Sequence, residues 1–198
     1  MFSRNSTTQL KKKSSICLLR LLRQHPDIVR PEFMMQKIQQ LMRMYHLGLL
    51  TSVTSLLLGL VKVADDITEY EQFVPRIIEI LDQMVISYVS SSKMAHYEYF
   101  GVPNPWLQIN LLRFLSHFPI PSDEALREKW ERVVKHLLFE KRIPSPDDSS
   151  RYITAKNAVL IEVFDLVPKL NTPDALKQTM FFFIFFIVAI SCSLVRLG

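Results

Sequence analysis

Apolar residues recur at steps of three and four along most of this 198-residue chain, and this spacing constrains the fold more than any other feature. It places apolar side chains on one face of an α-helix, whereas a half-buried strand requires a step of two. Runs of strict alternation are missing, and the chain has only four glycines for tight turns. The sequence therefore predicts an all-α fold of helices joined by short connections.

Seven helices are expected, and prolines separate several of them. The first is expected to stop at Pro26, and Pro31 opens the second. Pro105 opens the fifth with Asn104 as its N-cap, and Ser122 is the expected N-cap of the sixth. The expected ranges, in chain order, are about 7–25, 31–45, 47–64, 69–89, 105–118, 122–138 and 154–167.

The helices are expected to come in pairs. The first, third, fifth and seventh start near residues 7, 47, 105 and 154, so the steps are about 40, 58 and 49 residues. Helix pairs at roughly this period, stretched by loop insertions, are typical of HEAT and armadillo repeats. The sequence thus predicts an α-solenoid of about four pairs, in which neighbouring pairs stack to bury a continuous core. A non-repetitive helical bundle is the other arrangement that the pattern allows.

Positive charge is concentrated at the N-terminus. Residues 1–25 hold six Lys and Arg side chains and no acid, whereas the rest of the chain carries 18 basic and 19 acidic groups. This distribution argues against a nucleic-acid-binding surface. The cations are expected to form the solvated face of one amphipathic helix; contact with acidic lipid headgroups and a mitochondrial presequence are the alternatives.

No set of residues indicates catalysis. The five histidines show no metal-binding spacing, and phosphate-binding and hydrolase motifs are missing. Cys17 and Cys192 lie 175 positions apart in apolar segments, which suits a reducing, cytosolic setting. We therefore expect no catalytic residue, metal, cofactor or small-molecule substrate, and we expect the protein not to be an enzyme.

The stretch "HYEYFGVPNPWLQINLLRFL" combines a cluster of aromatic residues with a glycine and two prolines. The prolines forbid a continuous helix, so "GVPNPW" is expected to be a turn. The aromatic side chains are expected to plug a junction between repeats, and a ligand cage is the alternative. If Trp106 is buried, its replacement by alanine is expected to cost about 3–5 kcal/mol. The residues of this predicted repeat-junction cluster are Tyr97, Tyr99, Phe100, Gly101, Pro103, Pro105 and Trp106.

Four segments resemble successive parts of the trunk of the alpha-type adaptins, large subunits of the plasma-membrane clathrin adaptor complex. They are "KKKSSICLLRLLRQHPDIV", "HLGLLTSVTSLLLGLV", "YEYFGVPNPWLQINLLRFLSHFPIP" and "TAKNAVLIEVFDLV". The resemblance implies a helical scaffold in clathrin-mediated endocytosis that binds the small (sigma), beta and medium adaptor subunits. It also implies a cytoplasmic location, peripheral on the plasma membrane at coated pits. Lys11, Lys12 and Lys13 lie downstream of the family's phosphoinositide-contacting cluster and do not inherit that role.

The chain is expected to divide into a solenoid over residues 1–179 and a hydrophobic segment over 180–198. Met180 to Val195 is a run of 16 residues without a charge, about 24 Å long as a helix, whereas a bilayer core is roughly 30 Å thick. Resemblance and amphipathic patterning are expected to stop near Thr179, so an alternative or divergent end is favoured. The other interpretations are a helix buried against a partner and membrane insertion through 180–196. The last would make the chain a tail-anchored membrane protein with a helical-repeat recruitment domain.

Overall fold

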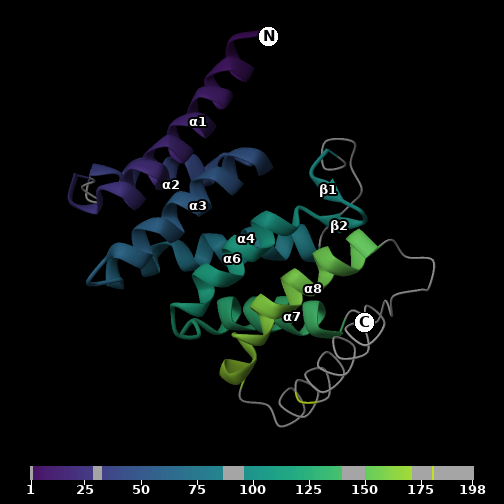
Figure 1. Cartoon of the computed structure of the whole chain (residues 1–198). Coiled ribbons are helices and arrows are strands. Elements are labelled where there is room, and N and C mark those ends of the chain that lie inside the picture. The colour runs from purple at the N-terminus through teal and green to yellow at the C-terminus, as the bar shows by residue number, and fades with distance from the viewer. Residues whose placement is uncertain (1, 29–32, 87–95, 140–149, 171–179, 181–198) are drawn as a thin grey trace, which may run out of the picture.

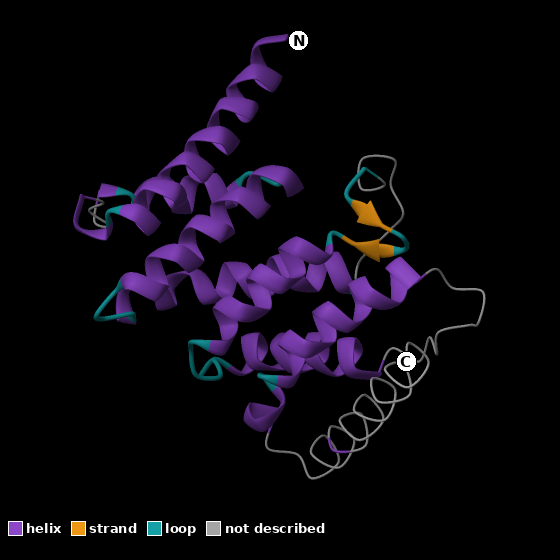
Figure 2. Ribbon diagram, viewed as in Figure 1, coloured by secondary structure: helices purple, strands orange, loops and turns teal. Residues whose placement is uncertain are grey.

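A computed structural model describes residues 2–28, 33–86, 96–139, 150–170 and 180. Figure 1 follows the chain from the N-terminus, and Figure 2 shows that helices dominate these ranges. The α-helices are α1 (Phe2–Gln24), α2 (Met35–Arg43), α3 (Leu47–Val63), α4 (Val74–Val85), α6 (Pro105–Ser116), α7 (Glu124–Phe139) and α8 (Ser150–Phe164). Short 3-10 helices are η1 (Pro26–Ile28), η3 (Thr68–Phe73) and η4 (Val167–Leu170), and one hairpin joins β1 (Glu98–Tyr99) to β2 (Val102–Pro103). The predicted all-α class is confirmed.

The helices stack in two layers. In the first layer α1 packs on α3, α3 on α6 and α6 on α8, so the predicted first, third, fifth and seventh helices are successive neighbours (Figure 1). In the second layer α4 packs on α7, and contacts of α2 with α3, α4 with α6 and α7 with α8 join the layers. This arrangement is the predicted solenoid of stacked helix pairs.

One continuous core holds the stack together. It runs from Leu19 in α1 to Leu170 in η4, and the phenyl rings of Phe114 and Phe118 lie 4.7 Å apart within it. Two ion pairs add polar links between neighbouring helices. Arg113 of α6 meets the buried Glu162 of α8 at 2.5 Å, and Arg132 of α7 meets Asp82 of α4 at 2.6 Å. Each layer is therefore fixed by apolar burial and by at least one charged contact.

Several expected boundaries differ from the structure. The second helix, expected to open at Pro31, is α2 and begins only at Met35, because Phe33 and Met34 form a turn before it. The first helix begins at Phe2, five residues early, because no proline or glycine interrupts residues 2–7. The expected helix 69–89 is a 3-10 turn followed by α4, because Pro75 lacks the amide hydrogen that a continuous α-helix needs and suits a first turn. The cap of α7 is Asp123 rather than Ser122, since the Leu126 amide donates to its carboxylate at 2.8 Å. Helix α8 begins at Ser150, four residues before the predicted start.

The predicted hydrophobic segment lies outside the described residues, apart from Met180. Within the described ranges, no helix combines the length and the hydropathy that crossing a membrane requires.

Lys169 ties the C-terminal end of α6 to η4. Its ammonium donates to the backbone carbonyl oxygens of Leu115, Ser116 and Phe118 at 3.3, 2.9 and 2.5 Å. These carbonyls lie at or just beyond the last turn of the helix, where no backbone amide of the helix can donate to them. Burial lowers the pKa of the Lys169 ammonium, yet the three acceptors compensate part of its lost hydration.

We expect Lys169→Met to lower the free energy of unfolding by about 1–3 kcal/mol, because three carbonyls at the end of α6 lose a charged donor. Urea denaturation followed by circular dichroism measures this loss. Lys129→Met, on an exposed position of α7, is the matched control and should change stability little. Equal effects of the two substitutions would contradict the capping role.

His46 is the N-cap of α3 and must be neutral to act as one. Its Nδ1 accepts a hydrogen bond from the Leu49 amide at 3.3 Å, and protonation would turn that acceptor into a donor. Burial, with a smaller contribution from the charge of Lys12, lowers the pKa of His46 below its ordinary value. Burial and the charges of Lys62 and Lys169 lower the pKa of His117 in the same way.

Stability should therefore fall in mild acid. Because the folded pKa values of the two histidines lie below the unfolded value, the unfolded chain binds more protons as the pH drops below about 6.5. Urea midpoints at about pH 7.5 and about pH 5.5 measure the loss. His46→Asn keeps a capping acceptor without titrating, so it should reduce this pH dependence. An unchanged pH dependence in the variant would show that His46 is not one of the groups responsible.

Candidate functional site: the hairpin between α3, α6 and α8

The predicted turn over 101–106 begins inside a two-stranded hairpin and ends in the first turn of α6, and the glycine of the hairpin meets a conformational need. Glu98 pairs with Pro103 and Tyr99 with Val102. The two residues between the strands, Phe100 and Gly101, have φ angles of 48° and 87°. Positive φ at both central residues is what a type I′ turn requires, and glycine adopts it without steric cost.

Asn104 connects this hairpin to two helices. Its backbone amide donates to the Tyr97 carbonyl at 2.9 Å, and its side-chain amide donates to the Thr51 hydroxyl of α3 at 3.3 Å. Its side-chain oxygen accepts from the Leu107 amide at 3.4 Å, as predicted for the N-cap of α6. Pro105 occupies the first turn of that helix, also as predicted. The hairpin is thereby held against α3 and against the start of α6.

The aromatic residues of the predicted cluster divide into two groups. Tyr97 is half-buried and faces His46, with ring centroids 6.2 Å apart. Tyr99 lies edge to face with Phe100 and with Trp106, at centroid distances of 4.8 and 5.0 Å.

Two rings of the second group, Phe100 and Trp106, face outward, whereas Tyr99 is partly buried. Phe100 is 44% exposed and Trp106 is 54% exposed, and the Arg151 guanidinium lies 5.1 Å from the Phe100 ring centroid. Trp106 is therefore not buried, and the large loss of stability expected for its replacement by alanine does not apply, because no buried cavity would be created. The side of the hairpin that does pack carries Val102, which forms a small buried cluster with Tyr152 and Ala155 of α8.

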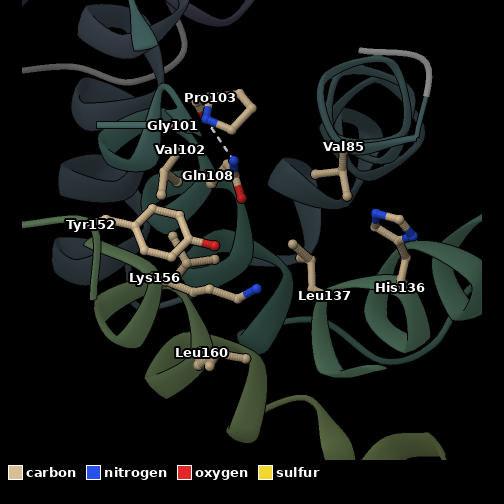
Figure 3. Close-up of a pocket in the computed structure, with 11 residues that line it drawn as sticks. Val85, Gly101, Val102, Pro103, Gln108, His136, Leu137, Tyr152, Lys156 and Leu160 are labelled. Atoms are coloured by element: carbon tan, nitrogen blue, oxygen red, sulfur yellow. Dashed lines mark hydrogen bonds between the residues drawn. The ribbon is translucent and has the colours of Figure 1, made fainter. Parts of the chain in front are cut away.

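A cavity of about 230 Å³ lies between the hairpin, the end of α4, and α6, α7 and α8 (Figure 3). Gly101 and Pro103 of the predicted cluster line it, together with residues that the sequence did not single out. Among these, Gln108 donates its side-chain amide to the Pro103 carbonyl at 2.6 Å, while its oxygen is buried without a hydrogen-bond partner. Neither Lys156 nor Tyr152 carries a local sequence signal for this cavity: Tyr152 precedes the expected helix 154–167, and Lys156 is one polar residue within it. The lining also includes His136 of α7.

The arrangement is suited to binding. Aromatic rings beside an arginine are the side chains that dominate the energetics of many protein interfaces. The cavity adds an unpaired acceptor and an ammonium group to apolar walls. Across the described ranges, no group of three or more His, Cys, Asp or Glu side chains is placed to hold a metal ion.

Comparison with known proteins identifies relatives along nearly the whole chain. The family model of the adaptin N-terminal region matches residues 2–197, so the match continues past Thr179, where the resemblance was expected to stop. AP-2 complex subunit alpha-1 of Arabidopsis thaliana is 33% identical over 171 residues, which is 86% of this chain and 16% of that protein. AP-2 complex subunit alpha-2 of Dictyostelium discoideum is 28% identical over 180 residues, covering 90% of this chain and 18% of the relative.

A gamma-type relative matches as well. AP-1 complex subunit gamma of Dictyostelium discoideum is 25% identical over 174 residues, 87% of this chain and 18% of that protein. The chain thus spans less than a fifth of the length of these curated relatives. The resemblance to alpha-type adaptins is confirmed, and the chain belongs to the adaptin family, matching the N-terminal region of its large subunits.

Proposed function

We propose that this chain acts as a scaffold segment of a clathrin adaptor large subunit, working by protein–protein binding in clathrin-mediated endocytosis and vesicle-mediated protein transport. The observation that carries the proposal is the family match over residues 2–197 of a chain that folds as stacked helix pairs. Stacked pairs present long surfaces on which partner proteins bind. No covalent chemistry is part of the proposed role.

The proposed partners are the small (sigma), beta and medium adaptor subunits, and the proposed location is the cytoplasmic face of the plasma membrane at coated pits. The names of the alpha-type relatives, which are subunits of AP-2 complexes, support this assignment. The structure offers surfaces that binding would bury. Leu10 and Leu21 are exposed and lie eleven residues apart, about three helical turns, so they share one side of α1.

The assignment predicts that the tagged chain recovers sigma and beta adaptor subunits when it is immunoprecipitated from cells. A truncated chain without residues 181–198 should recover them equally well, because the proposed binding depends on the solenoid. Leu50→Asp places a charge in the core of α3, so this unfolded control should recover neither subunit.

Failure of both folded forms to recover either subunit would contradict the scaffold role. Fractionation of the same cells tests the tail-anchored alternative, which rests on the uncharged run from Met180 to Val195. Membrane retention that disappears with the truncation, without adaptor recovery, would favour that alternative.

A further inference from the structure

The outer side of the hairpin carries a row of side chains that contact one another in sequence. The Tyr99 ring lies edge to face with the rings of Trp106 and Phe100, at centroid distances of 5.0 and 4.8 Å. The Arg151 guanidinium lies 5.1 Å from the Phe100 centroid and ends the row. The hairpin projects from the helices (Figure 2), and Trp106, Phe100 and Arg151 are exposed, so a partner can reach them in the folded chain. The aromatic row consists of Trp106, Tyr99, Phe100 and Arg151.

The polar groups of the aromatic row are mainly hydrogen-bond donors. The Trp106 indole N–H can only donate, and so can the N–H groups of the Arg151 guanidinium, whereas the Tyr99 hydroxyl can also accept. Among the residues that the structure describes, neither the indole N–H nor the guanidinium has a hydrogen-bond or ion-pair partner, and the guanidinium contacts the Phe100 ring. A matching ligand therefore offers acceptors and apolar surface, and it gains little from donors of its own.

The position of Arg151 is not explained by the stability of its helix. Arg151 lies in the first turn of α8, which contains no acidic residue, and the positive end of a helix dipole disfavours a cation there. The cation–π contact with Phe100 orients the guanidinium and leaves its N–H edges open to a carboxylate. The charge at this end of the row therefore favours a ligand with an acidic group.

We propose that the aromatic row binds a proline-rich segment of a partner protein with an acidic residue at one end. Proline has no backbone N–H, so such a segment offers carbonyl acceptors and apolar rings but few donors. It already adopts the extended polyproline II helix, so it loses little conformational entropy on binding to aromatic side chains. At about 3.1 Å per residue, four or five residues cover a row with steps of this length. The carboxylate accepts from Arg151, and a carbonyl accepts from the Trp106 indole.

An acidic membrane surface is another partner that exposed aromatic rings and a cation can meet. Binding of proteins to such a surface depends on clusters of about four or more Lys and Arg side chains. The aromatic row contains a single cation, so its charge is better matched by one carboxylate of a protein. The proposal does not depend on assembly with adaptor subunits, and its failure would leave the proposed function unchanged.

Titration of the ¹⁵N-labelled full-length chain, followed by NMR, tests this inference. The probes are acetyl-Asp-Pro-Pro-Pro-Pro-amide and acetyl-Pro-Pro-Pro-Pro-Asp-amide, which place the acid at either end. The chain has two tryptophans, and Trp130 is only 3% exposed, so its indole N–H signal is an internal control for that of Trp106. We expect at least one peptide to shift the Trp106 signal saturably and to leave the Trp130 signal in place.

Two altered peptides separate the contributions of charge and proline. Replacement of aspartate by asparagine should weaken binding about threefold, as expected for an exposed ion pair. Replacement of all the prolines by alanine should weaken it roughly tenfold, because the rings and the preformed helix are lost.

Arg151→Gln should remove the preference for the aspartate peptide over the asparagine peptide. Arg20→Gln makes the same change at an exposed position of α1 and is the matched control, and circular dichroism verifies that both variants are folded. Absence of saturable binding, equal affinity for all the peptides, or a Trp106 shift with phosphatidylserine vesicles only would each overturn the proposal. Peptide binding that appears only in a variant with Asp147→Asn and Asp148→Asn would assign the row to the chain's own acidic segment instead.

Discussion

The junction between α3 and α6 depends on Asn104, which is 4% exposed and adopts a left-handed backbone with φ of 36°. Such a conformation is unfavourable for most residues but accessible to asparagine. Its backbone amide and both polar atoms of its side chain bind three different elements: the hairpin, α3 and α6. A single residue thus fixes the direction in which the chain leaves the hairpin and the helix on which α6 stacks.

A second set of polar contacts fixes how α3 and α6 are aligned along their length. The Asn110 side-chain amide of α6 donates to the Ser55 hydroxyl of α3 at 2.8 Å, one turn beyond the contact of Asn104 with Thr51. Apolar surfaces alone tolerate sliding of one helix along another, whereas a buried donor and its acceptor must stay aligned. The α3–α6 contact therefore combines non-directional apolar burial with a few directional bonds that select one alignment.

The elements that could be predicted from the sequence are those that depend on local rules. The class, the stacked pairs and the Asn104–Pro105 start of α6 follow from periodicity, capping and proline chemistry, because each of these acts within a few residues. Contacts between distant segments could not be predicted in this way. From the sequence, Gly59 is expected only to lower the helix stability of α3 modestly. In the structure, a Cβ at this position would lie 2.4 Å from a methyl group of Leu19, so the glycine permits α3 to pack closely on α1. The cavity depends on such tertiary placement, and Gln108 and Lys156 carry no local signal.

The backbone of the hairpin is not explained by the stability of the stacked helix pairs alone. Stability in a stacked array comes from each pair and its nearest neighbours, so a segment that only connects pairs gains little from strained backbone. Phe100 nevertheless has a φ of 48°, which costs about 1–2 kcal/mol for a residue other than glycine. The strain turns its ring toward Tyr99 and Arg151 on the outer side of the hairpin, while Val102 packs against α8 on the other. Because a two-residue type I′ turn requires positive φ at both central positions, this strain is the cost of a tight hairpin that packs Val102 on α8 and leaves the Phe100 and Trp106 rings exposed.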